Sequence, residues 1–274
     1  MIVGVHLDGH EIRVCGVNSD GVVAHAASHK RSSSSDASEW AGSVQALPEA
    51  VQTVLPDDLG DLYLAAPPGV YQIRRVPLEV AEEVDRRNQV TWEVQQALCA
   101  KEDEYLIDYV ARGSSAVWIA IPTICVEKLT VGFADRDVAL KGICAEPLAI
   151  ALALRRIHPA GQVSALRATS SWITWVDLND GTLVAASSHN TKPDDLSTDA
   201  GTSRSRRDIL QRHIGETSHP PYFMGNIDES SDPEITNRSV SAVSFTNPVG
   251  YDCSDTLMTI AYGTALYGAH ESTL

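Results

Sequence analysis

The chain has 274 residues and a mass of 29.5 kDa, with 43% hydrophobic and 21% charged residues, which is typical of a globular protein with one large or two small domains. It has no run of 18 apolar residues and begins without the basic and apolar regions of a secretory signal, so we expect neither a transmembrane helix nor secretion. The 21 basic residues are outnumbered by 36 acidic ones, and a formal net charge of −15 disfavours nucleic acid and anionic membranes as partners. The five scattered cysteines form no CxxC pair, which favours buried thiols over disulfides or a metal site.

The N-terminal residues predict an antiparallel meander. Three short apolar runs cover residues 2–7, 12–16 and 22–26. Turn sequences at 8–9 and 18–21 separate them, and two tight turns between short apolar runs are typical of strands joined by hairpins.

Helices and strands alternate after the meander. Apolar residues at helical spacing, ended by proline or glycine, alternate with short apolar runs. The predicted elements are a helix from near residue 36 to 51, strands 62–66 and 70–76, helix 79–100, strands 105–111 and 116–121, helix 126–134, strand 140–144 and helix 147–157. This alternation predicts an α/β fold with a mixed sheet.

The second half repeats this plan after a boundary at residues 158–161. Strands 172–178 and 182–187 flank Asn179-Asp180-Gly181, a strong hairpin signal. The remaining predictions are a polar loop at 191–205, helix 206–213, strands 221–224 and 240–245 and helix 255–270. Two halves that each open with hairpin-connected strands indicate a duplicated architecture.

Several sequence segments, in this order and spacing, resemble the PilM family, the actin-like cytoplasmic proteins of type IV pilus assembly. The segments are IRRVPLE (73–79), TWEVQQ (91–96), DEYLIDY (103–109), AEPLA (145–149), NP (247–248) and AYGTAL (261–266). The resemblance spans nearly the whole chain and is densest over residues 60–155. The cytoplasmic domain of the type II secretion protein GspL is related to this family.

This resemblance implies a fold of two RNase-H-like domains around a cleft. The first domain covers residues 1–158, with a small inserted subdomain at about 74–111, and a shortened second domain covers 159–274. It further implies a cytoplasmic scaffold at the inner membrane, which binds the N-terminal tail of a PilN-like membrane protein and can form a ring of identical subunits.

The resemblance also suggests where the tail binds. The expected groove lies beside the subdomain, between the strand that carries Arg75 and the helix that carries Trp92 and Gln96, with Tyr109 as a further contact. An extended or helical apolar peptide would occupy it. A helix tryptophan more often packs in a core than binds a partner, so both interpretations of Trp92 stay open.

Actin-like ATPases hold the nucleotide phosphates between two hairpin turns, with an aspartate in each that supports Mg²⁺ through water. In the first turn of this chain, His6 stands where the family has its aspartate, although Gly4 and Gly9 remain. Asp8 stands at a position that faces phosphate, where a carboxylate would repel it. A shifted alignment would let Asp8 serve as the metal-supporting residue.

The second turn and the adenine-binding turn depart from the pattern as well. Arg167 replaces the second aspartate, Thr169 replaces a glycine, and Gly225 is the single glycine left of a Gly-Gly pair. We therefore expect a pseudo-ATPase with no catalytic residues, metal or cofactor. The alternative is an active ATPase that binds Mg-ATP in the interdomain cleft through Asp8 and Asp177. A third possibility is an RNase-H-like or sugar-kinase-like domain unrelated to pili.

Overall fold

The computed structural model describes ten segments of the chain: residues 1–7, 11–30, 47–52, 55, 60–80, 82–101, 103–169, 172–190, 221–224 and 258–271. The predicted loop 191–205, helix 206–213 and strand 240–245 lie outside these segments, as does most of the helix predicted from residue 36.

The first sheet begins with the predicted meander. Strand β1 pairs antiparallel with β2, which pairs antiparallel with β3, and β4 and β8 then continue the sheet in parallel. The order is β3-β2-β1-β4-β8, so β8 forms one edge. The strands are β1 (Ile2–Leu7), β2 (Glu11–Val17), β3 (Val23–Lys30), β4 (Asp61–Ala66) and β8 (Leu140–Ala145).

The second sheet repeats this arrangement, which confirms the predicted duplication. Its order is β11-β10-β9-β12, with three antiparallel strands followed by a parallel one. The strands are β9 (Gln162–Ala168), β10 (Trp172–Asn179), β11 (Thr182–Asn190) and β12 (Tyr222–Met224). Strand β9 was not predicted, because Ser164 and Arg167 interrupt its apolar pattern; both are buried and have polar partners.

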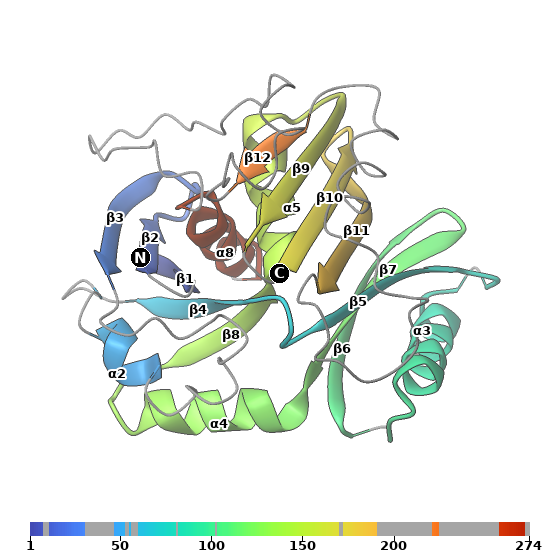
Figure 1. Cartoon of the computed structure of the whole chain (residues 1–274), viewed down its shortest axis with the longest axis horizontal. Helices are drawn as coiled ribbons and strands as arrows, with labels where there is room; N and C mark the ends of the chain where they lie inside the picture. The colour runs from blue at the N-terminus through green and yellow to red at the C-terminus, as the bar shows by residue number, and fades with distance from the viewer. Residues whose placement is uncertain are drawn as a thin grey trace, which may run out of the picture.

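Two helices fill the space between these sheets (Figure 1). α8 (Met258–Glu271) packs on β1, β2 and β4, α5 (Glu146–Ile157) packs on β10 and β11, and the two helices contact each other. On its other face the first sheet is covered by α2 (Leu47–Gln52) and α4 (Thr123–Ala134), whose Val51, Leu129 and Phe133 are fully buried. None of the helices described here is long and apolar enough to cross a membrane.

A third, smaller sheet stands apart at the right of Figure 1. Its order is β5-β7-β6, from β5 (Gln72–Pro77), β6 (Tyr105–Arg112) and β7 (Ser115–Pro122). Helix α3 (Glu83–Leu98) covers one face through Val90 and Val94. The sheet spans residues 72–122, so its central strand β7 lies beyond the range of 74–111 expected for the subdomain. The predicted division of the chain at residue 158 stays a prediction.

Close packing of α5 on α8 depends on Gly263. A Cβ atom at this position would overlap the backbone of Ala149, which cannot move without shifting α5. We therefore expect Gly263→Ala to lower the free energy of unfolding by about 3 kcal/mol, despite the better helix propensity of alanine. Urea unfolding followed by circular dichroism measures this change.

Gly132→Ala in α4 is the matched control. A Cβ atom there meets only the Pro48 side chain, with Cγ at 3.0 Å. This variant should unfold within about 0.5 kcal/mol of the wild type. Equal stability of the two variants would contradict the tight α5–α8 contact.

Candidate functional site

Three buried polar side chains meet at the ends of β1, β8 and β9. Arg167 on β9 donates a hydrogen bond from Nη1 to Glu146 Oε1 at 2.7 Å. His6 on β1 lies with Nε2 3.4 Å from Glu146 Oε2 and 3.4 Å from Arg167 Nη2. Each of the three is at most 1% exposed. An ion pair thus joins the two halves of the chain. It links Glu146, the first residue of α5, to Arg167 near the end of β9.

Burial decides the charge of this cluster. It lowers the pKa of His6 below its ordinary value, and this effect outweighs the nearby Glu146 carboxylate, which acts in the opposite direction. The imidazole is therefore neutral at pH 7, while the guanidinium of Arg167 and the carboxylate of Glu146 compensate each other. The cluster as a whole carries no net charge.

The neutral state of His6 makes stability depend on pH. Below about pH 6.5 the unfolded chain binds a proton at His6 that the folded protein excludes, so acid favours unfolding. The free energy of unfolding should fall as the pH drops from 7 to 5, by up to about 1.4 kcal/mol per pH unit from this group. In His6→Gln that contribution is lost, and the pH dependence flattens.

Urea unfolding at pH 5, 6 and 7 measures the effect. The control is His29→Gln, which removes an exposed imidazole from β3. An equal slope in wild type and His6→Gln would show that His6 titrates alike in the folded and unfolded chain.

Of the described residues that were predicted for a nucleotide site, the structure brings the side chains of His6 and Arg167 together. Gly4 lies against α8, where a Cβ atom would overlap the backbone of Ala261 and Ala265, so its small size serves helix packing. Thr169 closes the β9–β10 turn through its Oγ1, which accepts a bond from Trp172 N at 3.0 Å. Asp8, Gly9 and Gly225 lie outside the described residues.

The four residues predicted to bind a partner do not line one groove. Trp92 and Gln96 lie on the outer face of α3, where Trp92 is 56% exposed, so it is not a core residue. The Tyr109 hydroxyl donates to Glu83 Oε1 of α3 at 2.5 Å. Arg75 lies on the opposite face of the small sheet, because side chains alternate along β5 and its neighbour Val76 faces α3.

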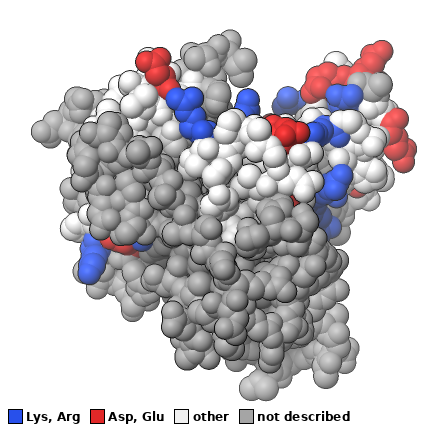
Figure 2. All heavy atoms as spheres, turned by 90° about the horizontal axis from the view of Figure 1, so that it is seen from above, with Lys and Arg blue, Asp and Glu red and all other residues white. Residues whose placement is uncertain are grey.

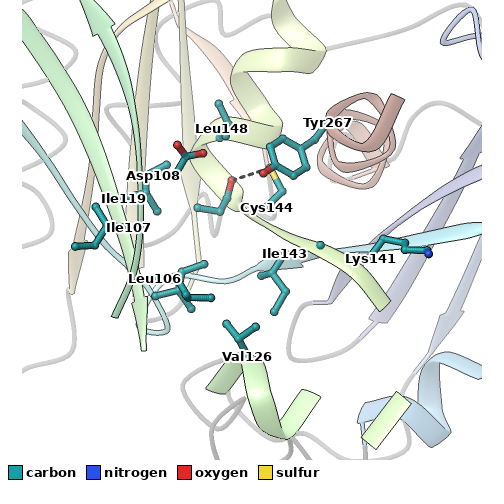
Figure 3. Close-up of a pocket in the computed structure, with 13 residues that line it drawn as sticks. Leu106, Ile107, Asp108, Ile119, Val126, Lys141, Ile143, Cys144, Leu148 and Tyr267 are labelled. Atoms are coloured by element: carbon teal, nitrogen blue, oxygen red, sulfur yellow. Dashed lines mark hydrogen bonds between the residues drawn. The ribbon is translucent and has the colours of Figure 1, made fainter. Parts of the chain in front are cut away.

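A groove does exist on the sheet face opposite α3. Its volume is about 290 Å³ and its lining is mainly apolar. One wall comes from the small sheet, where Leu106 pairs with Ile121 and Asp108 with Ile119. Val126 of α4, Ile143 of β8, Leu148 of α5 and Tyr267 of α8 complete the lining (Figure 3).

Two sheet edges border this groove. Five consecutive residues of β8, 141–145, and three of β6, 106–108, line it, which is expected of a strand edge because a face presents only alternate residues. β6 and β8 are edge strands, and no described strand pairs with either on the groove side. The site therefore combines an apolar surface with a sheet edge on both sides.

The charged surface around α3 is mixed in sign. Figure 2 shows acidic and basic side chains side by side on the part of the molecule that carries the small sheet. In sequence, Glu83 and Asp85 of α3 are followed directly by Arg86 and Arg87. This face has no field of one sign that would attract a nucleic acid. Within the described segments, no three potential metal ligands gather.

Glu146 and the groove residues were not predicted from the sequence as members of a site. Glu146 was noted only as part of a motif, yet it is a single acid before an apolar helix, and Arg167 is a single base in an apolar strand. Two isolated opposite charges within buried runs are a usable signal of a buried ion pair. The groove gives no such signal, since its residues come from six separate elements.

Comparisons with known proteins identify the fold. No family model and no curated protein matches the sequence. The chain is similar in structure to the protein in a PilM-PilN type IV pilus biogenesis complex, with a TM-score of 0.73, 12% identity and 98% of both chains covered. It also resembles the cytoplasmic domain of EpsL, an inner-membrane component of the type II secretion system of Vibrio cholerae, with a TM-score of 0.55, 10% identity and coverage of 97% and 94%.

A further similar structure comes from Bacteroides thetaiotaomicron and is described as a protein of unknown function with an actin-like ATPase fold. Its TM-score is 0.51 at 10% identity, covering 94% of this chain and 95% of that one. Together these matches confirm the predicted actin-like α/β fold and the structural likeness to PilM and to a secretion protein of the GspL type.

Proposed function

We propose that this protein is a non-catalytic scaffold of a type IV pilus or a related secretion or DNA-uptake machine. It binds the N-terminal tail of a PilN-like inner-membrane protein, and it does so at the cytoplasmic face of that membrane. The similar PilM structure is described as a complex with PilN, and EpsL as an inner-membrane component, which supports a partner and location of this kind.

The groove between β6 and β8 is the observation that carries the proposal. An extended peptide could lie along these two edge strands, pair its backbone with one of them and place alternate side chains on Leu106, Ile143 and Leu148. Apolar side chains would supply affinity, and main-chain hydrogen bonds would fix the direction. This location replaces the predicted groove beside Trp92.

The buried cluster supports a role without ATP hydrolysis. His6 and Arg167 stand at the two positions where the family has its metal-supporting aspartates. Glu146 already accepts a hydrogen bond from Nη1 of Arg167, and a triphosphate would have to displace this buried pair. The alternative ATPase would need Asp177, whose Oδ1 accepts a 2.5 Å bond from Ser164 on the neighbouring strand.

Titration of the purified chain with a peptide tests the proposal. The probe is a synthetic peptide of the N-terminal residues of the PilN-type protein from the same organism, labelled for fluorescence anisotropy. We expect saturable binding with micromolar affinity, weakened by substitutions in the groove. Absence of binding would contradict the proposed function.

A further inference from the structure

The groove between β6 and β8 is apolar except for two charged side chains. Asp108 lies on the β6 side and Lys141 on the β8 side, on opposite sides of the pocket in Figure 3. Lys141 has an acidic partner and Asp108 has no basic one among the described residues, and this difference bears on which peptide the groove accepts.

Lys141 already has a partner. Its Nζ lies 3.8 Å from Oδ1 of Asp61 on the neighbouring strand, and both side chains are about half exposed. A peptide that covers this end of the groove therefore meets a compensated charge.

Asp108 has no such compensation. One carboxylate oxygen, Oδ1, accepts the backbone N–H of Tyr109 at 2.8 Å, and among the described residues no basic side chain forms an ion pair with it. The side chain lies on the groove face, opposite Ile119 on the next strand. An apolar peptide that covers the groove would strip water from this carboxylate, and an unpaired carboxylate is costly to desolvate.

We infer that Asp108 selects a peptide carrying a lysine or arginine side chain that reaches it, within an otherwise apolar segment. This inference rests on the proposed function and names the chemistry of the partner. The net charge of −15 acts in the same direction, because it favours the approach of a basic peptide and opposes an acidic one.

A positional-scanning library tests the inference. The probe is a set of N-acetylated decapeptides, each with one fixed residue and the other positions randomised among apolar and small residues. Wild type should favour Lys or Arg over Gln at one position by about tenfold at low salt. Asp108→Asn should lose this preference and keep the apolar selection, and Asp108→Lys should favour Asp or Glu at the same position.

Asp135→Asn is the matched control, since it removes the same charge from the end of α4, outside the groove lining. It should select like the wild type. Apolar selection without a basic position, or a basic preference that persists in Asp108→Asn, would overturn the role of Asp108 and leave the proposed function standing. Absence of any apolar selection by the wild type would overturn both.

Discussion

Glu146→Gln is expected to lower the free energy of unfolding by about 3–5 kcal/mol, the largest stability effect of any single substitution considered for this protein. The substitution removes the carboxylate but leaves the Arg167 guanidinium 1% exposed and without its ion-pair partner. Urea unfolding at pH 7 measures the change. Because the pair links α5 to β9, the loss should appear in a single cooperative transition.

Two further variants separate the ion pair from simple loss of packing. The double variant Glu146→Leu with Arg167→Met replaces both charges by apolar groups of similar size, and it should recover most of the lost stability. Asp61→Asn breaks the half-exposed pair with Lys141 and should cost about 0–1 kcal/mol. A Glu146→Gln variant no less stable than Asp61→Asn would show that the buried pair does not hold the two halves together.

Leu106→Gln is expected to weaken binding of the PilN-type peptide by about tenfold or more, because it places an amide in the centre of an apolar groove wall. Leu106 is 52% exposed, so the fold should remain intact, with a change in the free energy of unfolding of about 0.5 kcal/mol or less. Fluorescence anisotropy measures the affinity.

Trp92→Ala is the matched control for this experiment. It removes a large apolar side chain of similar exposure, 56%, from the outer face of α3, on the other side of the small sheet. Peptide affinity should not change. A loss in Trp92→Ala with none in Leu106→Gln would return the binding site to the helix face predicted from the sequence.

Much of the architecture follows from local patterns in the sequence. Alternating apolar residues and turn sequences predict β1, β2 and β3, and the Asn179–Gly181 turn predicts the β10–β11 hairpin. Helical spacing predicts α3, although the helix begins at Glu83 and not at 79. The N–H of Glu79 instead donates to Gln89 Oε1, so the segment before the helix is held by a side chain.

The candidate site depends on long-range contacts that such patterns do not contain. The resemblance predicts Arg167 in place of an aspartate, and this stays a prediction. Its partner Glu146 lies 21 residues earlier in the chain and is identified only when α5 meets β9. Trp92 and Arg75 were expected to border one groove, yet strand alternation places them on opposite sides of a sheet. The groove itself forms where two sheet edges approach, which sequence spacing cannot encode.

Isothermal titration with Mg-ATP tests whether the molecule works as a binding scaffold without nucleotide hydrolysis. The two positions that the resemblance assigns to metal-supporting aspartates carry the buried His6 and the buried, ion-paired Arg167, so we predict no measurable heat of binding to the wild type at millimolar nucleotide. Micromolar binding that Asp8→Ala abolishes would contradict this account and support the ATPase.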